Sequence, residues 1–123
     1  MAPTRTTTRS TKATRRIDSR EKGARGERDC RDLLRGFGYE AHRGQQHSGG
    51  ADSPDVIHSI PGVHIEVKRV EGNDPYRWIK QAVSDCGDRV PVVFHRRNHK
   101  EWLVILRAED FLRTFAPPSR GEW

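Results

Sequence analysis

Two carboxylates and one amine occur at a spacing that suits phosphate chemistry. Asp55 follows a proline, and ten residues separate it from the triplet Glu66-Val67-Lys68. Because side chains alternate between the two faces of an extended strand, Glu66 and Lys68 point the same way. The alternating aliphatic residues Val63, Ile65 and Val67 take the opposite face. Carboxylate oxygens suit Mg²⁺ or Mn²⁺, and an ammonium group suits a phosphate or an attacking hydroxide. The spacing therefore favours metal-assisted hydrolysis of a phosphate ester.

The same triplet is also typical of an ordinary strand whose Glu and Lys face solvent, so this alternative stays open. Pro54 removes a backbone donor and predicts that Asp55 lies at the start of a short strand. Asp52 is the rival for the role of Asp55, but it lacks a preceding proline and lies in a Gly-rich stretch.

Further motifs resemble the PD-(D/E)xK nuclease superfamily and, within it, the archaeal-type Holliday junction resolvases and their phage relatives. The resemblance covers roughly residues 22–115 and rests on Gly23-x-x-Gly26-Glu27 at the start of a helix, Arg43 and Ser48-Gly49 in a Gly-rich loop, Pro54-Asp55, Glu66-Val67-Lys68 and a helix carrying Gln81. It implies an α/β, restriction-endonuclease-like fold, in which a central mixed sheet of about five strands is flanked by helices in the order α-β-β-β-α-β-β-α.

The resemblance also implies a catalytic site that uses Mg²⁺, for which Mn²⁺ substitutes. The metal ligands would be Glu27, Asp55, Glu66 and the carbonyl of Val67, with Lys68 assisting the nucleophile and Gln81 reaching the site from its helix. Two of these residues have simpler interpretations. Glu27 is spaced to form an i,i+4 ion pair with Arg31, and Gln81 is equally suited to the boundary of an apolar stripe.

Apolar periodicity and turn residues predict the elements that position these groups. We expect a helix that ends at Gly36 and Gly38, strands over Tyr39–His42, Val90–Phe94 and Trp102–Leu106, a hairpin of Val56–Ser59 with Val63–Val70, a helix from Asn73-Asp74-Pro75 to Gly87 and a helix over Glu109–Phe115. The last two strands are apolar on both faces, which predicts interior strands.

With 123 residues, the chain is expected to form one nuclease domain over residues 22–116, between a basic arm at residues 1–21 and a loose tail at residues 117–123. No apolar run is long enough to predict a membrane span. Cys30 and Cys86 fall at apolar helical positions, which predicts two buried, reduced thiols and a cytoplasmic location.

Positive charge is concentrated at the start of the chain. Residues 1–22 hold seven basic and two acidic side chains, which accounts for five of the six net positive charges. Such a segment favours contact with DNA phosphates, although a solubilising tail and, less readily, a transit peptide fit it too. The expected DNA contacts are Arg15, Arg16, Arg20 and Lys22 in this arm and Arg43, Gln45, Gln46 and Ser48 in the loop before Asp55, which is alternatively a plain connector.

These features predict a metal-dependent endonuclease that cuts branched DNA such as four-way junctions. A homodimer is expected, because a resolvase cuts two strands symmetrically and because the last two strands and the C-terminal aromatic residues supply excess apolar surface. Other PD-(D/E)xK nucleases of restriction or repair type, and a non-catalytic nucleic-acid-binding protein on the same scaffold, remain alternatives. The scattered histidines do not have zinc-ligand spacing, and neither a phosphate-binding loop nor a serine nucleophile elbow occurs.

Overall fold

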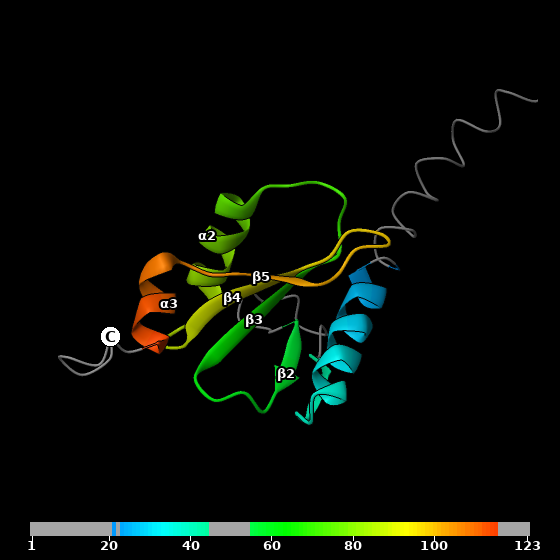
Figure 1. Ribbon diagram of the computed structural model, residues 1–123, viewed down its shortest axis with the longest axis horizontal. Coiled ribbons are helices and arrows are strands. Elements are labelled where there is room, and N and C mark those ends of the chain that lie inside the picture. Colours follow the sequence, from blue (N-terminus) through cyan, green and yellow to red (C-terminus); the bar gives the residue numbers. More distant parts are fainter. Residues whose placement is uncertain (1–20, 22, 45–54, 116–123) are drawn as a thin grey trace, which may run out of the picture.

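The computed structural model describes residue 21 and residues 23–44 and 55–115 (Figure 1). Several residues proposed to contact DNA therefore lie outside the described residues, namely Arg15, Arg16, Arg20, Lys22, Gln45, Gln46 and Ser48, as do Asp52 and the C-terminal tail. No helix within the described ranges is long and apolar enough to cross a membrane.

Five strands form two sheets rather than the single central sheet that the sequence predicts. Strands β1 (Ala41–Arg43) and β2 (Val56–His58) pair in antiparallel fashion. Strand β3 (Val63–Lys68) pairs in parallel with β4 (Val90–His95), which pairs in antiparallel fashion with β5 (Leu103–Ile105). The mixed α/β class is confirmed, whereas the expected hairpin between β2 and β3 has no ladder.

The contact between β2 and β3 is made by hydrogen bonds between side chains and backbone groups, not by backbone–backbone hydrogen bonds. Val90 N donates to the Gly62 carbonyl at 2.8 Å, and Arg96 N donates to the Lys68 carbonyl at 3.1 Å. The backbone N–H and C=O groups of the even-numbered residues of β3 therefore point toward β4. The odd-numbered residues therefore face β2, where Asp55 Oδ2 accepts the Val67 N–H at 2.8 Å. His58, at the other end of β2, has a hydrogen bond with the backbone of Val63. These contacts tie the two strands together without a ladder.

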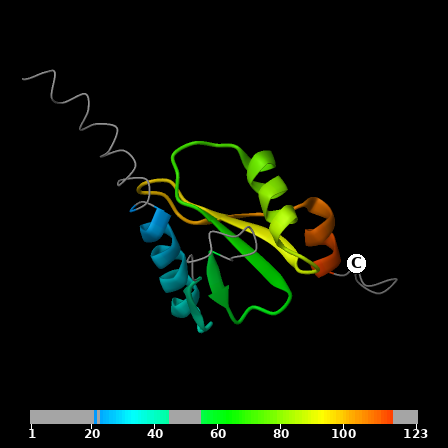
Figure 2. The same ribbon diagram turned by 180° about the vertical axis from the view of Figure 1, so that it is seen from behind.

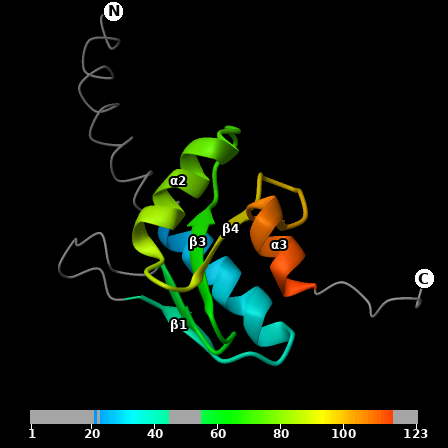
Figure 3. The same ribbon diagram turned by 90° about the vertical axis from the view of Figure 1, so that its left-hand side faces the viewer.

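Helices cover both faces of the three-stranded sheet (Figures 1 and 3). The first helix, residues 23–36, buries Cys30 and Leu34 against Ile65. Helix α2 (Pro75–Asp85) buries Trp78 and Ala82 against Val93 on the opposite face. Residues 69–74 arch from the end of β3 to the start of α2 (Figure 2), and a short helix, α3 (Ala108–Thr114), follows β5. Both cysteines are free and buried, as predicted.

The position of β5 differs from the sequence-based prediction of an interior strand. Strand β5 is an edge strand, so Leu103 and Val104 are 52% and 51% exposed instead of interior. Phe37 lies beyond the end of the first helix and is 78% exposed. Asp74 is the N-cap of α2 but makes no side-chain capping bond.

Gly26 sets how closely the first helix approaches the end of β3. A Cβ atom at this position would lie 2.4 Å from Cβ of Arg69 and 3.7 Å from its Cα. Those atoms belong to or adjoin the backbone, so they cannot swing away as the end of a long side chain would. The missing side chain at Gly26 therefore lets the helix place its neighbour Glu27 against the sheet.

We expect Gly26→Ala to destabilise the protein by about 1–3 kcal/mol, the usual cost of overpacking. Gly36→Ala in the same helix is the matched control, because nothing lies within 4 Å of a Cβ added there. It should leave stability unchanged or raise it slightly. Urea unfolding of both variants measures the difference. Equal stabilities would show that the helix does not depend on this close approach.

Candidate active site

Asp55 lies at the edge of β3 that does not pair with β4. Its Oδ2 accepts the Val67 N–H. In an extended strand the N–H and C=O of one residue point to the same side, so the Val67 carbonyl faces this edge too. The Asp55 carboxylate and the Val67 carbonyl thus lie on the same side of the strand, as the expected metal ligands require.

The carboxyl groups of Asp55 and Glu66 are within hydrogen-bonding reach of each other. Burial and the nearby charge of Glu66 raise the pKa of Asp55 to about 6, and the Val67 N–H and Lys68 only partly oppose this. A partly buried and a fully buried carboxyl group this close are costly to ionise together, so a proton or a cation between them is favoured. A divalent cation with oxygen ligands fits this pair and the Val67 carbonyl.

Glu66 does not lie on a solvated strand face. It is 3% exposed, beneath α2, and its Oε1 lies 2.9 Å from His64 Nε2. Asp85, the last residue of α2, completes a group in which one ligand atom from each of the three residues lies within 4.8 Å of the others. The burial of Glu66 excludes the interpretation of the triplet as an ordinary exposed strand.

Glu66 is therefore shared by two possible ligand sets. Asp55, Glu66 and the Val67 carbonyl offer only hard oxygen atoms, which Mg²⁺ and Mn²⁺ prefer. The set of His64, Glu66 and Asp85 includes an imidazole, which Mg²⁺ rarely accepts and transition metals bind well. His64 Nδ1 is a buried polar atom without a hydrogen-bond partner among the described residues. The oxygen-only set is the better match for magnesium.

Glu27 approaches the site from the first helix and contacts Arg43. Its Oε2 accepts bonds from Arg43 Nε and Nη2, both at 3.3 Å, while the i,i+4 candidate Arg31 donates to Asp32 instead. Burial raises the pKa of Glu27; Arg43 opposes the shift and the charge of Asp55 adds to it. The structure thus places Glu27 near Asp55 and gives it an arginine partner that the sequence did not predict.

The thiol of Cys30 is buried close to the carboxylate of Asp55. Burial, with smaller effects from the charges of Asp55 and Asp29, raises the pKa of this thiol to about 12. Cys30 is therefore a protonated, unreactive part of the wall behind Asp55.

Lys68 and Gln81 meet on the α2 face of the sheet. Lys68 Nζ donates to Gln81 Oε1 at 3.1 Å. Because the amide is neutral, it orients the ammonium group without cancelling its charge. The structure therefore joins the two residues that the resemblance placed in one site.

Comparison with known families matches residues 18–118 to the family described as phage putative PDDEXK endonuclease. The match covers most of the chain. The chain belongs to the PD-(D/E)xK endonucleases. No curated protein and no solved structure matches it.

In this PD-(D/E)xK protein, sequence reasoning did not predict that His64 and Asp85 lie beside Glu66. His64 precedes Glu66 by two residues, so strand alternation alone would have placed it on the same face. Asp85 carried no comparable signal, because its approach depends on how α2 crosses the sheet. It lies four residues after Gln81, and thus on the same side of the helix.

The raised pKa of Asp55 predicts a specific dependence of stability on pH in the metal-free protein. Since the folded-state pKa is about 6 and the ordinary value is 3.8, the folded state binds more protons between these values. Stability should therefore fall as pH rises from about 4 to about 6 and remain lowered above that range. Asp55→Asn keeps an acceptor for the Val67 N–H and removes the charge.

At pH 7.5 in EDTA, we expect Asp55→Asn to raise the unfolding free energy by on the order of 1 kcal/mol, and the gain should disappear near pH 4. Asp88→Asn, which changes an exposed carboxylate in a turn, is the control. Adding Mg²⁺ should stabilise the wild type more than Asp55→Asn, since ligands stabilise the state that they bind. Thermal unfolding across pH measures both effects, and parallel curves for wild type and Asp55→Asn would contradict the assignment.

Proposed function

We propose that this PD-(D/E)xK endonuclease is a Mg²⁺-dependent enzyme of the Holliday junction resolvase type that cuts branched DNA. Mn²⁺ is expected to replace Mg²⁺. The observation that carries the proposal is the contact between the Asp55 carboxyl group and the buried carboxyl group of Glu66, which lies on the strand that also presents Lys68. This arrangement combines a place for a divalent cation with a nearby fixed positive charge.

Each residue has a distinct role in this proposal. Asp55 and Glu66 hold the cation, with the Val67 carbonyl beside them and Glu27 in support. When bound, the cation supplies positive charge that polarises the scissile phosphate and makes water more acidic. The ammonium group of Lys68 faces the phosphate and stabilises the negative charge that develops in the transition state. Gln81 positions Lys68 for this task.

The net charge of +6 supports a DNA substrate. Arg43 uses only two of its five donors for Glu27, so others remain for a phosphate oxygen. The basic arm and the loop before Asp55, which lie outside the described residues, are proposed to add contacts with the DNA backbone.

A homodimer is proposed because the described surface includes an open groove between the first helix and strands β4 and β5. One part of its lining is apolar, with Leu33, Phe37, Phe94, Trp102 and Val104, and the other part is charged, with Asp29, Asp32, Arg96, Lys100 and Glu101. Burial of the apolar side of this groove in a second copy, with Lys100 and Glu101 left outside the contact, would place two active sites about a twofold axis, as paired nicking of a symmetric junction requires.

The central test compares a labelled four-way junction, a linear duplex of the same sequence and a single strand, each with Mg²⁺ or with EDTA. We expect paired nicks in the junction with Mg²⁺ and no cutting with EDTA. Asp55→Asn and Glu66→Gln should each lower the cutting rate at least about 100-fold while junction binding stays intact or tightens. Asp88→Asn should cut normally.

Preferential cutting of the linear duplex would replace the resolvase assignment with another PD-(D/E)xK nuclease activity. Junction binding without cutting in either metal would instead support the non-catalytic alternative.

Lys68→Ala is expected to lower the cutting rate by about 100-fold or more, because it removes charge stabilisation in the transition state. Binding of the junction should change little. Lys80→Ala, an exposed lysine next to Gln81 on α2, is the matched control and should cut normally. Single-turnover rates at saturating enzyme separate the chemical step from binding. Normal single-turnover cutting by Lys68→Ala would remove this lysine from the reaction.

A further inference from the structure

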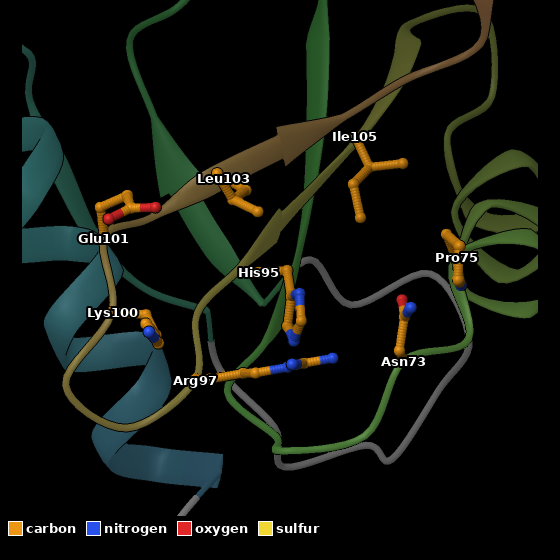
Figure 4. Close-up of a pocket in the computed structure, with 8 residues that line it drawn as sticks. All are labelled: Asn73, Pro75, His95, Arg97, Lys100, Glu101, Leu103 and Ile105. Atoms are coloured by element: carbon orange, nitrogen blue, oxygen red, sulfur yellow. The ribbon is translucent and has the colours of Figure 1, made fainter.

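A cavity of about 510 Å³ lies at the carboxyl ends of β3 and β4 (Figure 4). It adjoins the basic turn between β4 and β5, residues 96–100, which the proposed mechanism does not use. It is lined by Asn73, Pro75, His95, Arg97, Lys100, Glu101, Leu103 and Ile105. Its volume lies in the usual range for ligand sites, and the carboxyl end of parallel strands is a common place for them.

Strand register places this cavity on the same sheet face as Lys68. Lys68 is opposite His95 in β4, and His95 is opposite Leu103 in β5. Opposite residues in paired strands share a face, so the three side chains form a row across the sheet. With neighbouring strands about 4.8 Å apart, the cavity begins about 5–10 Å from Lys68. That distance reaches roughly the next one or two phosphates along one strand of duplex DNA.

The floor of the cavity is fixed by His95. Its ring lies 4.6 Å from that of Trp78, centroid to centroid, and its Nε2 is 3.0 Å from the Val70 carbonyl. Leu103 and Ile105 form an apolar wall beside it. Figure 4 shows the Arg97 side chain extending into the cavity alongside His95, with Asn73 across from it.

The turn that carries Arg97 and Lys100 is held from several directions. Arg96 Nε donates to the Lys100 carbonyl at 2.6 Å, and Lys100 N donates to the Arg97 carbonyl at 3.2 Å. Asn98 N donates to Glu71 Oε2 at 2.9 Å, which ties the turn to the connection before α2. The two basic side chains are thus presented from a fixed backbone, which lowers the entropic cost of binding an anion.

The positive charges of Arg97 and Lys100 are available to a ligand, because the nearby carboxylate of Asp29 pairs with other arginines. Arg96 and Arg69 both pair with Asp29, at 3.9 and 3.7 Å. Arg97 and Lys100 are exposed, and among the described residues neither has a carboxylate within ion-pair distance. Glu101 also lines the cavity, but it pairs with neither, so one acidic group faces two unpaired basic ones.

We propose that this cavity is a subsite for the DNA strand flanking the cleavage site, in which Arg97 and Lys100 bind backbone phosphate oxygens. The inference rests on the proposed nuclease function and names a contact that this function needs. The planar guanidinium of Arg97 suits bidentate contact with a phosphate, and Lys100 adds a second charge. The apolar wall of Leu103 and Ile105 suits the sugar edge of the same nucleotide. The residues belong to a turn and an edge strand, so they are accessible to a long polymer.

The test uses the double variant Arg97→Gln with Lys100→Gln in the full-length protein. The matched control is Arg77→Gln with Lys80→Gln, which removes the same two charge types from exposed positions on α2. Fluorescence anisotropy measures binding of a labelled four-way junction in EDTA between 50 and 200 mM salt. We expect the turn variant to bind roughly 10-fold or more weakly and to lower the salt slope by about two, with a clearly smaller effect in the control.

A second arm locates the contact by replacing single phosphates with neutral methylphosphonates along the junction strand. Wild type and control should lose affinity at one or two positions within about three nucleotides of the nick, and the turn variant should be insensitive there. Equal binding by the turn variant and the control, or equal sensitivity at every position, would overturn the subsite. These measurements do not depend on cutting, so failure of the subsite is distinguishable from failure of the nuclease assignment, which the cutting assay reports.

Discussion

The hydrogen bond from the Val67 N–H to the Asp55 carboxylate determines how the centre of this protein is built. It occupies a backbone donor on the open edge of β3 that a β2–β3 ladder would otherwise use. The two strands form no ladder, and β2 pairs only with β1 among the described strands. The same bond places Asp55 against Glu66 and Cys30, in a partly buried position that a carboxylate avoids unless donors or cations surround it. One side-chain bond thus connects the division into two sheets with the formation of the site.

The second constraint is the excess of acidic groups around that bond. Asp55 lies within hydrogen-bonding reach of Glu66, Asp85 reaches Glu66 from α2, and Glu27 on the first helix has Arg43 as a partner. Such a cluster costs folding free energy in the absence of a cation, and the raised pKa of Asp55 records that cost. A divalent cation held by these carboxylates would reduce the repulsion between them, which would favour its binding. Stability is lowered where function needs the charge, as is common for binding and catalytic sites.

The alternation of side chains along the sequence predicted part of the candidate site. The remaining contacts depend on how distant strands and helices pack together. Alternation along β3 correctly placed Glu66 and Lys68 on one face, whereas the approach of Gln81 to Lys68 was implied by the family resemblance and not by its position on the helix. The split into two sheets could not be predicted in the same way, because it depends on whether a side chain or a strand takes the Val67 N–H. The burial of Glu66 depends on the crossing of α2, and the partner of Glu27 depends on the position of β1. Each of these outcomes is set by packing rather than by sequence spacing.

The partners of the basic residues around the sheet end indicate which ones are available to a substrate. Asp29 holds Arg69 and Arg96, so these two arginines fix the first helix to the sheet, whereas Arg43 contacts Glu27 with only part of its guanidinium group. Lys68 instead meets the neutral amide of Gln81, which directs its charge without neutralising it. A carboxylate in that place would bind the ammonium more strongly and would also repel a phosphate. The amide partner therefore preserves the attraction of Lys68 for a polyanion, which a carboxylate partner would remove. In this respect Lys68 differs from Arg69 and Arg96, whose charges are used in ion pairs that hold the fold together.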